Sequence, residues 1–187
     1  MTGFPKRYHD VSLDNYVATT PSEKAALQAA RRFAEGDIGS LVLAGPVGCG
    51  KTHLAIAAAR ARKVKRPGWT DPEWCSVPEL MVGLRHDFGR PADDREWEDL
   101  AAGLRTAKGV VVLDDLGQEK SSDWTGEIIY TLANGRYNDI LPTIATTNLT
   151  QDQLAASPYW SVVSRLAQDG VLIRIVGADH RMAKATR

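Results

Sequence analysis

Short apolar runs and longer amphipathic segments alternate along the chain. The runs cover residues 40–44, 74–77, 110–115, 142–148 and 171–176. A continuous apolar run of this length is typical of a strand that is buried on both faces of a sheet. The segments between the runs carry apolar residues at helical spacing, and they predict helices over residues 21–35, 51–63, 78–88, 95–107, 123–138, 150–156 and 158–169.

Residues at the ends of these segments support the helix boundaries. Thr20 stands where an N-cap is expected, Pro21 follows at the first turn, and Glu23 lies near the positive end of the helix. Gly36 stops the same helix. Strands that alternate with helices predict a parallel sheet joined by right-handed crossovers. The expected fold is therefore a three-layer α/β nucleotide-binding fold with a five-stranded parallel sheet.

Composition limits the function only weakly. The 187 residues suffice for one domain, which we divide into a leading segment at 1–20 and a core at 21–187. Lys and Arg number 23, as do Asp and Glu, so net charge gives no argument for nucleic-acid or membrane binding. Cys49 and Cys75 form neither a CxxC pair nor a zinc-site spacing. Two reduced thiols and the absence of a signal-like N-terminus predict a cytoplasmic protein without a membrane segment.

One glycine-rich loop points to a phosphate ligand. The sequence from Gly45 to Thr52 satisfies GxxxxGK[ST] and lies between a predicted strand and a predicted helix. Glycines let successive N–H groups surround phosphate oxygens, Lys51 reaches the β and γ oxygens, and the Thr52 hydroxyl ligates Mg²⁺. A glycine-rich turn beside a surface lysine is the alternative. The nucleotide-binding residues expected here are Gly45, Pro46, Val47, Gly48, Cys49, Gly50, Lys51, Thr52 and His53, the last of these structural rather than catalytic.

Two further strands end in polar residues that suit the same site. The run at 110–113 ends in Asp114 and Asp115, and we expect Asp114 to hold the Mg²⁺ shell and Asp115 to orient the attacking water. The next strand ends at Asn148, which can touch the γ-phosphate or its water. Acids often end strands, and an asparagine often starts a turn. The acid pair and the asparagine therefore indicate a nucleotide site only in combination with the phosphate loop.

The order of these parts resembles an AAA+ ATPase, and more narrowly the DnaC/DnaI helicase-loader and IstB transposition-helper group. The similar pieces are GPVGCGKTH, VVVLDDLG, the TTN strand, the SRL helix, the leading GFPKRYHDVSLDNY, the PELM helix and the closing GADHR. The resemblance covers nearly the whole chain. Such proteins carry a partner-binding region before the ATPase core, whereas this chain begins almost at the core. It also leaves no room for a substantial C-terminal lid.

The resemblance implies a role for each matching residue. Gly45 to Thr52 would be Walker A, Asp114 and Asp115 would be Walker B, and Asn148 would be sensor 1. Aspartate at 115, where many AAA+ proteins have glutamate, implies slow turnover. The further matches are Arg165 as arginine finger on the ATP of the next subunit, Arg181 as second-sensor arginine, and Asn15 and Tyr16 as residues that pass the adenine.

Each of these residues also has a structural alternative. An arginine on an amphipathic helix is usually solvated or ion-paired, and Tyr16 can equally anchor the leading segment. The basic run at 60–66 is expected to be a solvated helix end, with contact to a phosphate backbone as the alternative. Trp69, Trp74 and Trp97 are expected to pack in the core.

The function implied is an ATP-switched helicase loader that hydrolyses ATP with Mg²⁺. Its partners would be a replicative DNA helicase and single-stranded DNA, and it would form a homo-oligomer when ATP is bound. An IstB-like helper of a transposase is the first alternative. A small-molecule kinase is the second, although the segment after Asp115 lacks the arginines expected of a kinase lid. A degenerate binding module is disfavoured by Lys51, Thr52 and Asp114.

Overall fold

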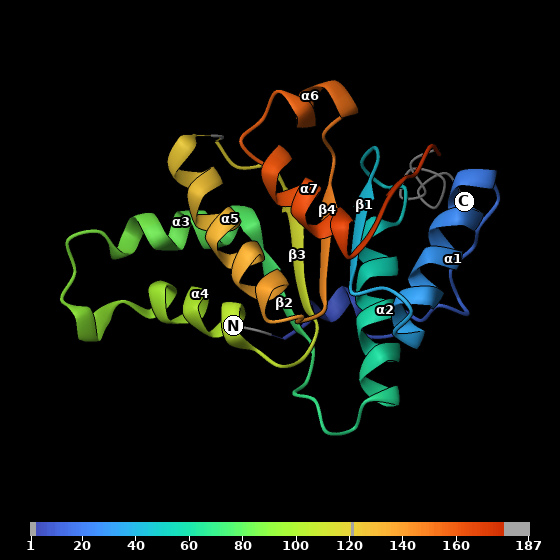
Figure 1. Cartoon of the computed structure of the whole chain (residues 1–187), viewed down its shortest axis with the longest axis horizontal. Helices are drawn as coiled ribbons and strands as arrows, with labels where there is room; N and C mark the ends of the chain where they lie inside the picture. The colour runs from blue at the N-terminus through green and yellow to red at the C-terminus, as the bar shows by residue number, and fades with distance from the viewer. Residues whose placement is uncertain (1–2, 121, 178–187) are drawn as a thin grey trace.

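Five parallel strands form one sheet in the order β2-β3-β4-β1-β5 (Figure 1). The computed structural model describes residues 3–120 and 122–177. All five predicted strands are present, as β1 (Ser40–Ala44), β2 (Glu73–Ser76), β3 (Val111–Leu116), β4 (Thr143–Thr147) and β5 (Gly170–Arg174). The phosphate loop therefore follows an interior strand, β1, which is flanked by β4 and β5.

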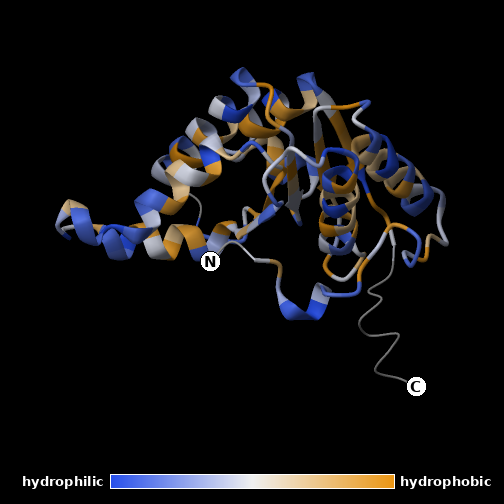
Figure 2. Ribbon diagram, turned by 90° about the horizontal axis from the view of Figure 1, so that it is seen from below, coloured by the Kyte–Doolittle hydropathy of each residue, from blue (hydrophilic) through white to orange (hydrophobic). Residues whose placement is uncertain are grey.

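Helices cover both faces of the sheet, as the alternating pattern predicts (Figures 1 and 2). The helices are α1 (Pro21–Glu35), α2 (Lys51–Lys65), α3 (Val77–Asp87), α4 (Glu96–Thr106), α5 (Asp123–Asn138), α6 (Gln151–Ala155) and α7 (Trp160–Gln168). Short 3-10 turns, η1 (Lys6–Tyr8) and η2 (Ala92–Asp94), lie outside these layers. Most predicted boundaries differ from the observed ones by one or two residues. Helix α3 begins at Val77 because Ser76 is its N-cap, and α7 begins at Trp160 rather than at the preceding proline.

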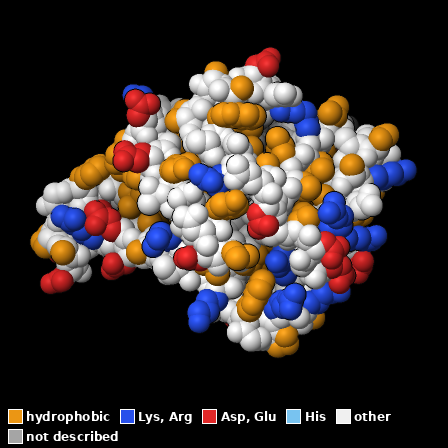
Figure 3. Space-filling model, viewed as in Figure 1, with side chains coloured by type: hydrophobic (Ala, Val, Ile, Leu, Met, Phe, Trp, Pro, Cys, Tyr) orange, Lys and Arg blue, Asp and Glu red, His pale blue; other side chains and the backbone are white. Residues whose placement is uncertain are grey.

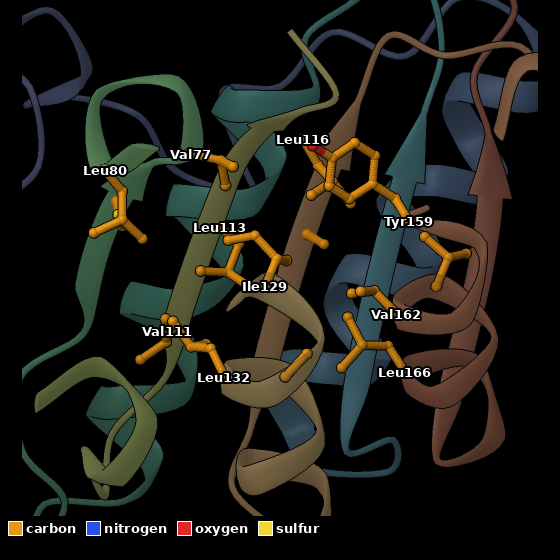
Figure 4. Packing of buried hydrophobic residues seen from close by; sticks show 14 of the residues in the cluster. Val77, Leu80, Val111, Leu113, Leu116, Ile129, Leu132, Tyr159, Val162 and Leu166 are labelled. Atoms are coloured by element: carbon orange, nitrogen blue, oxygen red, sulfur yellow. The ribbon is translucent and has the colours of Figure 1, made fainter. Parts of the chain in front are cut away.

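Two hydrophobic clusters fill the space on either side of the sheet. Successive residues of β3 alternate between the clusters, since strand side chains point to opposite faces: Val111 and Leu113 belong to one, and Val112 to the other. The first cluster packs the sheet against α3, α5 and α7 (Figure 4). The second packs it against α1 and α2. The three-layer expectation is confirmed.

Capping boxes fix the starts of three helices. Thr20 accepts a hydrogen bond from the Glu23 N–H, and the Glu23 carboxylate accepts one from the Thr20 N–H in return. Ser122 and Thr125 make the same exchange at α5. The box at α1 also holds the end of the sheet, because the Ser22 hydroxyl donates to the Val176 carbonyl at 2.8 Å.

A buried arginine ties together the loops at the amino edge of the sheet. Arg136 on α5 is fully buried, and burial lowers the pKa of its guanidinium to about 10, so it is still charged near neutral pH. All its donors face acceptors, and such complete pairing makes a buried charge tolerable. The acceptors are Thr143 Oγ1 and the carbonyls of Leu104, Ala107, Gly109 and Pro142.

Candidate nucleotide-binding site

The phosphate loop is a tight main-chain turn fixed to the ends of two strands. The Gly45 N–H donates to the Thr147 carbonyl of β4 at 3.1 Å. Gly48 and Gly50 adopt φ angles of +79° and +89°, a region that disfavours side chains. A Cβ at Gly45 would lie 2.5 Å from the Ile175 carbonyl oxygen. Glycine is therefore required here by conformation and by close packing.

Lys51 places its ammonium inside this loop. The side chain is buried, and Nζ donates to the carbonyls of Gly45 at 3.0 Å and Pro46 at 2.8 Å. Helix α2 begins at Lys51, so its positive end faces the same space as the ammonium. The loop thus brings a cation and a helix N-terminus to one point, and this is the arrangement that binds phosphate groups.

Thr52 and Asp114 meet across the gap between α2 and β3. The Thr52 hydroxyl lies 3.0 and 3.1 Å from the two carboxylate oxygens of Asp114. Burial raises the pKa of Asp114, and nearby Asp115 adds to the rise, while hydrogen bonds from Thr146, Thr52 and Trp74 oppose it. A hydroxyl beside one carboxylate fits Mg²⁺, which takes few protein ligands and completes its shell with water and phosphate oxygens. Within the described residues there is no cluster of three or more His, Cys, Asp or Glu suited to a metal ion.

Two contacts to Asp114 come from residues that sequence reasoning did not assign to the site. The indole Nε1 of Trp74 on β2 donates to Asp114 Oδ2 at 3.2 Å. The Thr146 hydroxyl on β4 donates to Asp114 Oδ1 at 2.6 Å. Trp74 was expected only to pack, and the threonine before Asn148 carried no signal of its own. Strand order alone could have found them, because β2 and β4 both flank β3.

Asp115 and Asn148 lie side by side at the carboxyl edge of β3 and β4. Asp115 has φ of +60°, which is unusual for a residue other than glycine, and the register of β3 against β4 shifts at this point. The Asn148 amide nitrogen donates to Asp115 Oδ1 at 3.4 Å. Asn148 Oδ1 is buried without a hydrogen-bond partner among the described residues. The structure therefore brings together five of the six residues predicted for catalysis and metal binding, which are Lys51, Thr52, Asp114, Asp115 and Asn148.

The leading segment contacts the loop from behind through Tyr16. The Tyr16 hydroxyl donates to the Cys49 carbonyl at 3.2 Å, and its ring meets the His53 ring edge-on at 5.3 Å between centroids. A Cβ at Gly50 would lie 2.7 Å from the Tyr16 ring. The Asn15 amide is engaged in the turn of its own segment, accepting from the Ser12 N–H and donating to the Asp10 carbonyl. These contacts fit the alternative in which Tyr16 anchors the leading segment.

Removing the Tyr16 hydroxyl gives a test of that role. We expect Tyr16→Phe to lower the free energy of unfolding by about 1 kcal/mol, the usual worth of one hydrogen bond, because the ring packing is kept. ATP affinity should stay unchanged. Urea denaturation and titration calorimetry measure the two quantities. A large loss of ATP affinity at unchanged stability would instead assign the hydroxyl to the nucleotide.

Arg165, one of the two predicted arginines, has its contacts on α5 rather than in this cluster. Arg165 on α7 reaches α5, where its guanidinium donates to the Tyr130 hydroxyl at 3.3 Å and lies 5.1 Å from the centroid of the Tyr137 ring. Within the described residues, none of its hydrogen bonds or ring contacts is with the phosphate loop of the same chain. Arg181 lies outside the described residues.

The basic run at 60–66 is engaged within the fold, so its interpretation as a solvated helix end is wrong for most of its charges. Arg60 donates to three carbonyls of the leading segment, and buried Arg62 donates to the Phe33 and Ile38 carbonyls. Lys65 pairs with Glu35. Figure 3 shows basic and acidic side chains intermingled over this end of the molecule. The donors of Arg60 and Arg62 are thus directed at main-chain carbonyls of the fold rather than at a phosphate backbone. None of the described helices is both long and apolar enough to cross a membrane.

The fold and the site define a P-loop nucleotide-binding domain of the AAA+ type. Residues 15–177 match the family described as IstB-like ATP binding protein, and the chain belongs to that family. It is 23% identical over 188 residues to the replicative helicase loader DnaC of Escherichia coli strain K12, a match that covers 99% of this chain and 74% of the relative. It is 30% identical over 122 residues to the phage-like element PBSX protein XkdC of Bacillus subtilis strain 168, covering 62% of this chain and 42% of the relative.

Solved structures agree with this assignment. A crystal structure of the DnaC helicase loader superposes with a TM-score of 0.76 at 31% identity, covering 92% of this chain and all of the other. A crystal structure of DnaI gives a TM-score of 0.75 at 23% identity, covering 95% and 94%. The expected family and fold are thereby confirmed.

Proposed function

We propose that this protein binds and hydrolyses ATP and acts as a helicase loader whose assembly on single-stranded DNA is controlled by the nucleotide. The observation that carries the proposal is the convergence of the Lys51 ammonium, the Thr52–Asp114 pair and the Asp115–Asn148 pair at one edge of the sheet. The similarity to helicase loaders over nearly the whole chain supports the biological role.

Binding of the triphosphate is assigned to the loop and to α2. Lys51 would exchange its hydrogen bonds to the Gly45 and Pro46 carbonyls for bonds to the β and γ oxygens. Thr52 and Asp114 would hold Mg²⁺, directly or through water. Bound Mg²⁺ supplies positive charge that offsets the charge developing on the phosphates. The remaining glycine N–H groups would surround the phosphate oxygens.

Hydrolysis is assigned to the residues at the ends of β3 and β4. Asp115 would orient the attacking water, and its aspartate side chain is shorter than the glutamate common at this place, which favours slow turnover. Asn148 Oδ1 is a buried acceptor that can receive a hydrogen bond from this water. The amide nitrogen, which donates to Asp115, would hold the Asn148 and Asp115 side chains in a fixed position relative to each other.

We infer that the purine lies beside the loop, where exposed valines from three segments of the chain are candidates to contact it. Val17, Val47 and Val176 are 71%, 52% and 66% exposed, and they come from the leading segment, the phosphate loop and the end of β5. The contact between Ser22 and the Val176 carbonyl keeps the end of β5 next to the start of α1. We therefore assign the leading segment, residues 1–20, the role of covering the base. Asn15 and Tyr16 would support the part of this segment that forms the cover.

Two arginines complete the proposed cycle. Arg165 would act on ATP bound by the next subunit, which is consistent with its position on α7 away from the loop of its own chain. Arg181 would sense the nucleotide from the C-terminal segment. Because the γ-phosphate would be contacted by two subunits, ATP would favour the assembled state and hydrolysis would release it.

We expect ATP, and not ADP, to increase the mass of the protein in solution, and single-stranded DNA to raise its ATPase rate. Both effects follow if the subunit interface is completed by the γ-phosphate and stabilised by DNA. Light scattering after size-exclusion chromatography, in Mg·ATP and in Mg·ADP, measures the mass. Phosphate release with and without an oligonucleotide measures the rate.

The same measurements separate the alternatives. The family match favours, as a second candidate, a helper of a transposase, which predicts stimulation by duplex DNA rather than by a single strand. Transfer of the γ-phosphate to a nucleoside or metabolite would identify a kinase and overturn the ATPase proposal. Equal mass in both nucleotides, with no response to any DNA, would overturn the assembly part of the proposal.

A further inference from the structure

Among the residues that the structure describes, Thr146 is the one side chain that hydrogen-bonds to both members of the acid pair. Its hydroxyl donates to Asp114 Oδ1 at 2.6 Å and accepts from the Asp115 N–H at 3.0 Å. A threonine hydroxyl has one proton to donate, and here that proton goes to the carboxylate. Thr146 itself is fully buried in the middle strand of the three that carry the site.

These contacts occur where the ladder between β3 and β4 is irregular. The register shifts between Leu113 and Leu116, and Asp115 lies at φ of +60° within that interval. A positive φ at a residue with a Cβ costs free energy and persists only when neighbouring groups hold it in place. In a regular ladder the Asp115 N–H would pair with a main-chain carbonyl, whereas here it pairs with the Thr146 side chain.

The shift has a consequence for where the two acids point. Side chains of adjacent strand residues face opposite sides of a sheet, so a regular β3 would direct Asp114 and Asp115 away from each other. The left-handed Asp115 instead lies with its carboxylate against Asn148, while Asp114 meets Thr52. The irregularity therefore brings a metal-holding acid and a water-orienting acid to one site.

We propose that Thr146 is a positioning residue that couples the two acids, fixing the Asp114 carboxylate for Mg²⁺ and holding the Asp115 main chain in its left-handed turn. This inference rests on the proposed ATPase function. Trp74 donates to the other oxygen of Asp114, and the Thr52 hydroxyl lies close to both oxygens, so loss of the Thr146 hydroxyl removes the shortest of the hydrogen bonds that fix this carboxylate. The same loss leaves the Asp115 N–H without its acceptor.

The test replaces the hydroxyl by a methyl group of similar size. We expect Thr146→Val to lower kcat by about tenfold or more and to weaken Mg·ATP binding, while ATP binding measured in EDTA is unchanged. Thr146→Ser retains the hydroxyl and should restore both quantities. A fluorescent ATP analogue titrated with and without Mg²⁺ gives the binding measurement independently of turnover.

Thr143→Val is the matched control. Thr143 lies on the same strand, is equally buried and uses its hydroxyl twice, accepting from Arg136 and donating to the Leu141 carbonyl. It is about 10 Å from Thr146 along the strand, at the opposite edge of the sheet. We expect Thr143→Val to lower stability without changing the ratio of affinities with and without Mg²⁺.

Measurements on the wild-type protein distinguish failure of the proposed Thr146 role from failure of the proposed ATPase function. If the wild type binds and hydrolyses Mg·ATP, and Thr146→Val does the same with unchanged Mg²⁺ dependence, the coupling role is refuted. Failure of Thr146→Ser to restore what Thr146→Val loses also contradicts it, because the hydroxyl is then not the active feature. If the wild type itself shows no Mg²⁺-dependent ATP binding, the proposed function fails first.

Discussion

Lys51→Ala is expected to abolish measurable ATP turnover, with a loss of about 10²–10³-fold or more, the range found when one charge-stabilising donor is removed from an active site. The Lys51 ammonium is buried inside the loop and is held at 3.0 and 2.8 Å from two loop carbonyls. Among the described residues, no other Lys or Arg side chain hydrogen-bonds to an atom of residues 45–52. Binding of Mg·ATP, measured by calorimetry, should weaken together with turnover.

Lys65→Ala provides the control for this substitution. Lys65 lies at the opposite end of the same helix, and its charge is paired with Glu35 far from the loop. Both variants remove one lysine from α2, so a general effect of charge or of helix stability would appear in both. If folded Lys51→Ala protein hydrolysed ATP at the normal rate, the loop would be excluded as the phosphate site. The ATPase function proposed for this α/β domain would then be withdrawn.

The chain order of the elements could be predicted because each carries a local signal. The apolar runs at 40–44 and 110–115 alternate between two clusters as strands, and Thr20 caps α1 as its sequence context indicates. The phosphate loop could be predicted equally well, because its glycines satisfy a local requirement for positive φ angles. Boundaries differed by one or two residues where a cap, such as Ser76 at α3, determined the true start.

Contacts between strands were not predictable in the same way. Trp74 reaches Asp114 only because β2 lies beside β3, and Thr146 matters only because the ladder with β4 shifts at Asp115. The contacts of the basic run at 60–66 were not predicted for a related reason. Sequence alone does not reveal that the leading segment returns to lie against Arg60. The residues missed are those whose role depends on a partner distant in sequence.

Arg165→Ala is expected to keep ATP binding and lose about 10³-fold in hydrolysis, the lower range reported for arginine fingers. The guanidinium contacts α5 through Tyr130 and Tyr137, and in the described part of the chain none of its hydrogen bonds reaches the loop of the same subunit. A finger that serves a neighbour must lie away from its own nucleotide, so this position fits action between subunits. Phosphate release and analogue binding, measured at the same protein concentration, separate the two effects.

Mixing two inactive variants tests whether the arginine acts between subunits. A Lys51→Ala subunit cannot use its own ATP site but still carries Arg165, whereas an Arg165→Ala subunit has the reverse defect. In an equimolar mixture, about a quarter of head-to-tail interfaces would join an intact loop to an intact arginine. Recovery of about a quarter of the wild-type ATPase activity would support an arginine finger that acts on the ATP of the neighbouring subunit. No recovery, with both variants shown to co-assemble, would mean that Arg165 acts within its own subunit or only supports the packing of α7 on α5.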